Sequence, residues 1–328
     1  MVTVAASNRF RHLAWFYQGC GEYLTAVRSL VHASQVRGDV VLVAVPDRNA
    51  QLMSQALGNG SADVALVDMT ALGGNPARII PALLAWARKH RGQHACCIGE
   101  PVWPGRTAAE TQEAIRHEAL LNLAFRDRPA TFFCLYDSAG LPASVIADAA
   151  STHPAVVNDR QEAPSASYLG PPGLPPRCTE ALPRPPAHAV LLRYAGDLRA
   201  VRSFVTSRAT GAGLTPARIA DLVLAVSELA ANTLRHTDGG GTVQAWVTPE
   251  EFICQVADTG EITDPLARHR ARPERPLGGA GLWLVNEVCD LVEARSGQAG
   301  TTTRLHMRLH DLRTEATRRG YRTIMGAA

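Results

Sequence analysis

Short apolar runs alternate with helical patterns along the first half of the chain. The runs are nearly continuous in apolar character, which is typical of strands buried on both faces of a parallel sheet. Between them, apolar residues recur at the spacing of one helix face. This βαβ repetition predicts a mostly parallel sheet with right-handed crossovers. The predicted strands are 12–17, 39–45, 63–69, 94–100, 131–137 and 155–158, and the predicted helices are 22–37, 49–57, 76–90, 108–125 and 142–150.

Proline interrupts this pattern in residues 159–187. Because proline lacks a backbone N–H and fixes φ, we expect this stretch to form neither a helix nor a central strand. It is predicted to be a semi-extended linker, or a strap packed between two domains.

A different order of elements follows the linker. Strands are predicted at 190–194, 242–248, 251–258, 292–295 and 301–309, and helices at 198–209, 216–237 and 281–291. Strands on one side and helices on the other predict an α/β two-layer sandwich. The predicted organisation is an N-terminal domain at 10–158, a linker at 159–187, a second domain at 188–310 and a basic tail at 311–328, for which a disordered end is favoured over a docking helix.

Composition supports two domains and excludes some partners. The chain has 328 residues, of which 46% are hydrophobic, so it can bury a sizeable core. A net charge of +3 with no basic stripe argues against direct nucleic-acid binding. The opening residues lack the order of a signal peptide, and no apolar run is long enough to span a membrane. We therefore expect a cytoplasmic protein.

The cysteines and one histidine are candidates for reactive groups. None of the seven cysteines forms C-x-x-C, so they are expected to be buried free thiols in a reducing cytosol. His and Cys do not cluster at ligand spacing, so no metal site is expected among them. His117–Glu118 resembles the start of a phospho-acceptor motif, but an ordinary surface position on a helix is favoured. The loop after the first strand lacks the Lys and Ser or Thr of a phosphate loop, which argues against a nucleotide site there.

The helix at 216–237 carries a polar stripe opposite its apolar face. Thr215 can cap its start, and Pro216 suits the first helical position. Glu228 and Asn232 are four residues apart, so a carboxylate and a carboxamide lie side by side. Such a pair can act on a hydroxyl and a hard metal ion, although a solvated polar face would look the same on this helix alone.

Two further motifs follow this helix in the chain. Asp258–Thr259–Gly260 comes at the end of a predicted strand, and Gly279–Ala280–Gly281–Leu282 begins a predicted helix. Glycines at such a helix start let backbone N–H groups approach phosphate oxygens at the positive end of the helix dipole. Each motif alone is weak evidence, because Asp-x-Gly at a strand end is usually an ordinary turn and Gly-x-Gly before a helix is often only a tight helix entry. The combination of all three motifs, in this order and on these predicted elements, is a specific signal.

The second half resembles the GHKL ATPase superfamily through these three motifs, which match its N, G1 and G2 boxes. Within it, VSELAANTLRHT (226–237) and GGAGLWLVNEVCDL (278–291) look most like the anti-sigma regulatory serine/threonine kinases. The first half resembles the MEDS sensory domain, a RecA-like fold without a working phosphate loop. That resemblance is carried by HLAWFYQGCGEYLTAVRSLV (12–31), GEPVW (99–103), IRHEALLN (115–122), FFCLYD (132–137) and THPAVV (152–157). It implies signal sensing without naming a ligand.

The GHKL resemblance implies an ATP and Mg²⁺ site. Asp258 would accept a hydrogen bond from the adenine amine, and Gly260 would leave room for the base. Gly279, Gly281 and Leu282 would lie at the phosphates, and Thr303 would close the adenine pocket. Asn232 would bind Mg²⁺ through its carbonyl oxygen. Glu228 would be the general base.

The segment 261–279 resembles the lid that closes over ATP. Its arginines would either reach phosphates or only keep a loop soluble; they are Arg268, Arg270, Arg272 and Arg275. Ile262 stands where the family often has a second glycine.

Two functional hypotheses follow from the resemblance. The first is an ATP-dependent anti-sigma regulator that binds a sigma factor, or phosphorylates a serine of a STAS-type anti-anti-sigma partner, under control of the N-terminal domain. The second is a non-catalytic module whose nucleotide state sets partner affinity, which Ile262 motivates. Because such kinases are often dimers, a homodimer is compatible with either hypothesis.

Overall fold

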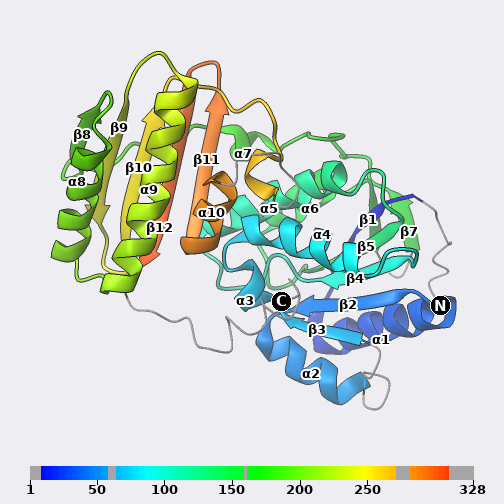
Figure 1. Ribbon diagram of the computed structural model, residues 1–328. Coiled ribbons are helices and arrows are strands. Elements are labelled where there is room, and N and C mark those ends of the chain that lie inside the picture. The colour runs from blue at the N-terminus through cyan, green and yellow to red at the C-terminus, as the bar shows by residue number, and fades with distance from the viewer. Residues whose placement is uncertain (1–8, 58–63, 159–160, 271–280, 310–328) are drawn as a thin grey trace. The chain divides into compact units, whose positions relative to one another are not determined.

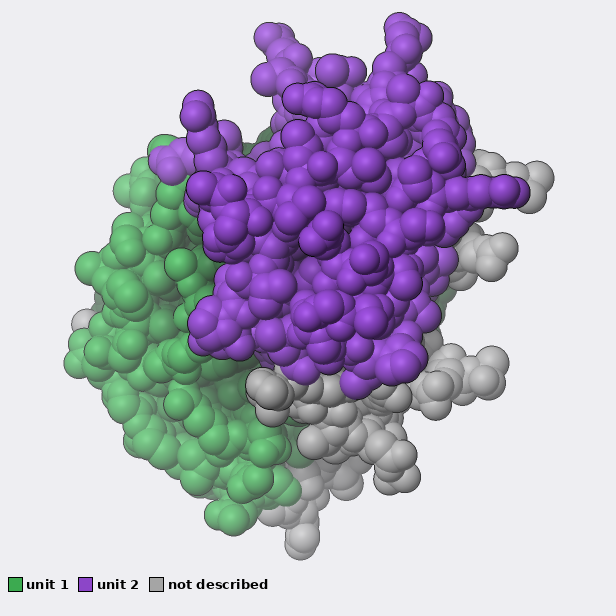
Figure 2. Space-filling model, turned by 90° about the vertical axis from the view of Figure 1, so that its left-hand side faces the viewer, with its two compact units in different colours: residues 1–178, 313–328 green, residues 179–312 purple. Residues whose placement is uncertain are grey.

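The computed structural model describes residues 9–57, 64–158, 161–270 and 281–309 (Figure 1). The chain divides between Cys178 and Thr179 into two compact units, coloured green and purple in Figure 2. Each unit has its own sheet. None of the described helices is long and apolar enough to span a bilayer.

The N-terminal unit is built on a mostly parallel sheet, as the sequence predicts. Its described strands lie in the order β3-β2-β4-β5-β1-β6-β7, and only β7 runs antiparallel to its neighbour. The strands are β1 (Arg11–Tyr17), β2 (Val40–Val45), β3 (Val64–Asp68), β4 (Ala95–Gly99), β5 (Ala130–Asp137), β6 (Ala155–Asn158) and β7 (Gln161–Pro164).

Helices cover both faces of this sheet, which explains the continuous apolar runs. One face packs against α1 and α2, and the other against α5 and α6. The helices are α1 (Gly19–Arg37), α2 (Asp47–Leu57), α3 (Met69–Gly73), the short η2 (Pro76–Arg78), α4 (Ile79–Lys89), α5 (Ala108–Ala124), α6 (Ala143–Thr152) and α7 (Pro176–Thr179). The short α3 was not predicted; Asp68 caps it by accepting a hydrogen bond of 2.8 Å from the Thr70 N–H.

The proline-rich segment is more ordered than its sequence predicts. The expectation that it contains no helix was wrong, because α7 forms one turn starting at Pro176. Proline is compatible with a first helical turn, where its missing N–H has no intrahelical partner to lose. Strand β7 lies at the edge of the sheet, where Pro164 pairs opposite Ala155 in register, in keeping with the exclusion of proline from central strands.

The C-terminal unit is a two-layer sandwich, as predicted. Its antiparallel sheet has the order β11-β12-β10-β9-β8, and α8, α9 and α10 lie on one face of it (Figure 1). The elements are β8 (Val190–Tyr194), α8 (Leu198–Gly211), α9 (Pro216–His236), β9 (Gly241–Val247), β10 (Glu251–Asp258), η3 (Ala267–His269), α10 (Gly281–Val288), β11 (Leu291–Gly297) and β12 (Gly300–Arg308). The core between the layers includes Val205, Leu222, Val226, Leu305 and Met307, all nearly inaccessible to solvent.

The opposite face of this sheet is polar, and the chain before β8 crosses it. Arg304 donates hydrogen bonds to Gln255 Oε1 and, at 2.5 Å, to the carbonyl of Pro183. Arg295 donates to the carbonyl of Glu180 at 3.1 Å. The segment that follows α7 therefore packs as a strap on the C-terminal unit.

Candidate functional site

Helix α9 presents the predicted carboxylate–carboxamide pair. Thr215 caps the helix by accepting a hydrogen bond from the Arg218 N–H. Glu228 and Asn232 are half-buried, so they are not part of a fully solvated face. Arg235 donates a hydrogen bond of 2.9 Å to Asn232 Oδ1, the atom that the resemblance assigns to Mg²⁺. Metal binding at this atom would therefore require Arg235 to move.

The first residue of α10 lies against the Glu228 carboxylate. A Cβ atom built on Gly281 would lie 2.5 Å from Glu228 Oε2. Glycine therefore lets the start of α10 approach this carboxylate closely. The next residue, Leu282, is partly buried and packs against the core of the unit. Gly279 lies outside the described residues.

Asp258 is held at the end of β10 by two hydrogen bonds. Its Oδ2 accepts from the hydroxyl of Thr233 at 2.6 Å, and its Oδ1 accepts from the Gly260 N–H at 2.8 Å. The Thr233 hydroxyl also accepts from the hydroxyl of Tyr194 at 2.9 Å. An ionised carboxylate has about four acceptor positions, so Asp258 retains the capacity to accept from an amine.

A row of hydroxyl groups fixes the chain just beyond Asp258. Thr301 donates to the carbonyl of Gly260 at 2.7 Å, and its hydroxyl lies 2.7 Å from that of Ser296. Ser296 accepts a hydrogen bond of 2.7 Å from the Ile262 N–H. The start of the lid-like segment is therefore fastened to the β11–β12 hairpin.

Gly260 has no room for a side chain. A Cβ atom there would lie 2.9 Å from Thr237 Cγ2 and 3.1 Å from Asp258 Oδ1. Both neighbours belong to the candidate site, so a larger residue would displace one of them. This crowding gives a physical reason for glycine at this position.

Sequence reasoning missed several residues of this network. Thr233, Tyr194 and Ser296 were not singled out, and Thr301 pairs opposite Asp258 in the register of β10 and β12. The sequence alone does not give this register, so it could not identify Thr301 as a neighbour of Asp258. Thr303 is buried opposite Val256, and its role at the adenine remains a prediction.

The two described lid arginines make contacts within the C-terminal unit. Arg268 donates to the carbonyl of Val292 at 3.2 Å, and Arg270 forms an ion pair of 3.1 Å with Asp264. Arg272 and Arg275 lie outside the described residues. Whether any of them reaches a phosphate stays a prediction.

In the N-terminal unit, the prediction for His117–Glu118 was wrong. Their side chains are 2% and 1% exposed, so neither is a surface residue. Helix α5 is packed between the sheet and its neighbours η2, α4 and α6, which buries more than one of its faces. Glu118 also contacts His12 and His153, which sequence spacing did not bring together.

Two family models match the chain. Residues 11–154 match MEDS, the methanogen/methylotroph, DcmR sensory domain, and residues 193–307 match the histidine kinase-like ATPase domain. A search of curated proteins found no match.

Several solved structures match part of the chain. Two of them are the RsbU and RsbW domains of Rv1364c from Mycobacterium tuberculosis (22% identity, 38% of this chain and 33% of that chain, TM-score 0.29) and the histidine kinase AdeS of Acinetobacter baumannii (15%, 37% and 70%, TM-score 0.23). The match thus spans 33% of the length of the first of them. At such TM-scores neither likeness carries a conclusion.

Proposed function

We propose that this chain, which joins a MEDS sensory domain to a histidine kinase-like ATPase domain, is an ATP-dependent anti-sigma regulator. In this proposal the C-terminal domain binds ATP and Mg²⁺. It then holds a sigma factor, or phosphorylates a serine of a STAS-type anti-anti-sigma partner, in the cytoplasm. The MEDS domain biases that activity in response to a signal.

The fixed carboxylate at the end of β10 is the observation that carries the proposal. Asp258 is oriented by Thr233 and by the Gly260 N–H, and it lies within the segment that matches the ATPase family model. An oriented carboxylate acceptor suits the exocyclic amine of an adenine ring. Thr303 lies on the adjacent strand in the same proposal.

The phosphate end of the site would be built from α9 and α10. The backbone at Gly281 and Leu282 begins α10, whose positive dipole end favours phosphate oxygens. Asn232 would supply a carbonyl oxygen to Mg²⁺, an ion that neutralises phosphate charge when it is bound. Glu228 is half-buried beside this helix start. It would take the proton of a serine hydroxyl as that oxygen bonds to the γ-phosphorus and ADP leaves.

A non-catalytic binding module is the second candidate. The hydrogen bond from Arg235 to Asn232 Oδ1 favours it, because the atom assigned to Mg²⁺ already has a cationic partner. Ile262 favours it as well, since its N–H is tied to Ser296 at the start of the lid-like segment. In this alternative, ATP would change partner affinity and would not be consumed.

Phosphotransfer from radiolabelled ATP to STAS-type proteins of the same organism separates the two candidates. Under the kinase proposal the wild-type chain labels a serine of one of them. Glu228→Ala then removes labelling while ATP binding remains, and the exposed carboxylate variant Glu250→Ala behaves as wild type. Unchanged labelling in Glu228→Ala would refute its role as the base. Binding of ATP without labelling of any STAS-type protein would favour the non-catalytic module.

A further inference from the structure

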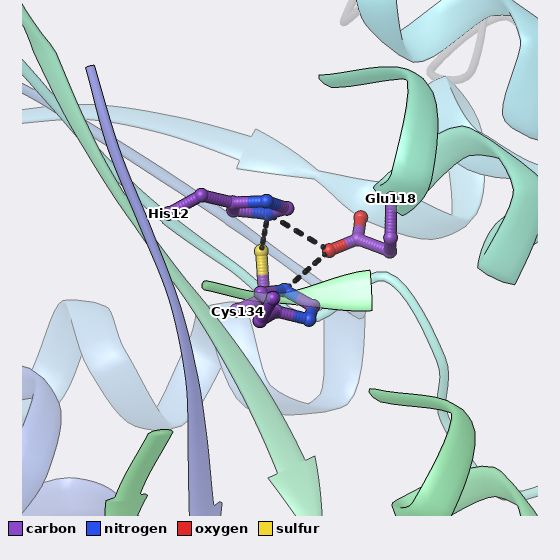
Figure 3. Close-up of side chains that lie close together, drawn as sticks. His12, Glu118 and Cys134 are labelled. Atoms are coloured by element: carbon purple, nitrogen blue, oxygen red, sulfur yellow. Dashed lines mark hydrogen bonds and ion pairs between the residues drawn. The ribbon is translucent and has the colours of Figure 1, made fainter. Parts of the chain in front are cut away.

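A cluster of potential metal ligands lies buried in the MEDS domain and shares no residue with the candidate nucleotide site. It consists of His12 on β1, Glu118 on α5, Cys134 on β5 and His153 directly after α6. Each side chain offers one ligand atom, and these atoms all lie within 4.8 Å of one another. None of the four residues is more than 5% exposed. Figure 3 shows His12, Glu118 and Cys134 converging from their separate elements.

Three of the distances between these ligand atoms are close to those of a small tetrahedral site, and the whole set lies within 4.8 Å. His12 Nε2 lies 3.2 Å from Glu118 Oε2 and 3.3 Å from Cys134 Sγ. His153 Nε2 lies 2.9 Å from the same carboxylate oxygen. Ligand atoms of a tetrahedral zinc ion stand about 3.3–3.6 Å apart, as follows from metal–ligand distances of about 2.0–2.3 Å. Small adjustments would therefore be enough to enclose an ion.

The outer hydrogen bonds of both imidazoles leave their Nε2 atoms available as ligands. His12 Nδ1 lies 3.2 Å from Asn122 Oδ1, and His153 Nδ1 lies 2.7 Å from the carbonyl of Ala149. The Asn122 amide is oriented, because its Nδ2 donates to the carbonyl of Thr152 at 2.9 Å. Both Nδ1 atoms therefore carry the proton and donate to oxygen. This is the second-shell arrangement that fixes the tautomer of metal-binding histidines.

Without a positive charge between them, the inner atoms would repel one another. With both Nδ1 atoms protonated, the Nε2 lone pairs of His12 and His153 point at Glu118 Oε2, at 3.2 and 2.9 Å. A cation bound between these atoms would remove that repulsion.

We propose that His12, Glu118, Cys134 and His153 bind one divalent transition-metal ion of the zinc class. Two imidazole nitrogens, a carboxylate oxygen and a thiolate form a ligand set that zinc accepts, whereas Mg²⁺ and Ca²⁺ prefer oxygen ligands alone. Binding would release the proton of the Cys134 thiol, because the thiolate is the form that binds the ion. A small cavity, also lined by Gly99, Pro101 and His117, adjoins Glu118 and Cys134.

Such an ion would tie together distant parts of the sensory domain. Its ligands come from two strands of the sheet, from α5 and from the end of α6. Four protein ligands would leave no open coordination position, which is typical of structural zinc sites. Metal occupancy would therefore change the stability of the MEDS domain.

Cobalt substitution of the full-length protein tests this proposal. The purified chain is stripped with a chelator and titrated with Co²⁺. We expect one equivalent to bind, with the intense visible bands of tetrahedral cobalt and a near-ultraviolet thiolate-to-cobalt band. Cys134→Ser should remove the thiolate band. Cys96→Ser is the matched control, since Cys96 is an equally buried thiol on the opposite face of the sheet and should leave both features unchanged.

A second variant keeps the test valid if Cys134→Ser does not fold. Asn122→Ala retains all four ligands and removes the acceptor that orients His12, together with the amide donor to the Thr152 carbonyl, so apparent metal affinity should fall by about 10–100-fold. Affinity is read by competition with a chromogenic chelator. The proposal is overturned if the stripped protein takes up no Co²⁺, or if its spectrum shows no thiolate band. Either result would mean that the four side chains share protons in a hydrogen-bonded network.

Discussion

The hydroxyl of Thr233 joins two polar groups of the candidate nucleotide site, and Thr233→Val tests its contribution. The hydroxyl accepts a hydrogen bond from Tyr194 at 2.9 Å and donates one to Asp258 at 2.6 Å. Valine has nearly the same shape, so the substitution removes both hydrogen bonds and leaves little cavity. Tyr194 is 6% exposed, and its hydroxyl would lose this partner in the interior.

The expected cost follows from the two bonds. A hydrogen bond between neutral groups contributes about 1 kcal/mol, and one to a charged group about 1.5–3 kcal/mol. Asp258 is half-buried, so water recovers part of its loss. We therefore expect the free energy of opening to fall by about 2 kcal/mol, which is about a thirtyfold change in the opening equilibrium.

Hydrogen exchange of the full-length protein measures this change within the C-terminal unit. Amides of β10 should exchange about thirtyfold faster in Thr233→Val than in the wild type. Thr242→Val is the control, because the Thr242 hydroxyl makes only a 3.5 Å contact to the carbonyl of Ala257. If both variants exchange at the wild-type rate, Thr233 does not hold Asp258 in the way described.

Two further predictions concern charged groups of the same unit. Burial alone would lower the pKa of His306, but hydrogen bonds to Glu251 and Glu293 outweigh it and raise the pKa to about 9. This value exceeds the pKa of about 6.5 for an unfolded histidine, so the stability that protonated His306 contributes to the folded unit should be complete below about pH 6.5 and lost as the pH rises through 9. The free energies of unfolding in urea of the wild type and of His306→Gln should therefore converge at high pH. A constant difference between the two proteins across this pH range would contradict the assignment. Arg218→Met should lower the free energy of unfolding by about 3–5 kcal/mol, because it leaves the buried carboxylate of Asp290 without its guanidinium partner. In urea titrations, the double variant with Asp290→Asn should recover part of this loss. A loss below about 1 kcal/mol in Arg218→Met would show that the pair contributes little to stability.

The sequence predicted the sheets and the order of the elements well, because local patterns encode them. The strand at 131–137 has an unbroken run of apolar and aromatic residues from Phe132 to Tyr136, and β5 is indeed covered on both faces. The start of α9 was also predicted correctly, since Thr215 caps the helix as the sequence predicts. The pairing of Glu228 with the start of α10 could not be derived, since it depends on the packing of two helices.

Prediction failed where burial depends on distant parts of the chain. His117 lies on a helix whose polar residues resemble a solvated face, yet α5 is enclosed by its neighbours. The partners of Glu118 come from β1 and from the end of α6, more than 30 positions away on either side. No local spacing carries that information. The turn of helix at Pro176 was missed for a different reason, since proline was treated as a breaker in a position where it is tolerated.

Calorimetric titration of ATP with Mg²⁺ into the full-length protein tests the central claim most directly. The account predicts binding to the wild type. It also predicts an affinity about 100-fold lower for Asp258→Asn, because the new amide turns a donor toward the adenine amine and removes a charged acceptor. The variant should keep its fold, since the amide can still pair with Thr233 and the Gly260 N–H. Equal affinity in the two proteins, or no binding at millimolar ATP, would contradict the assignment of this site.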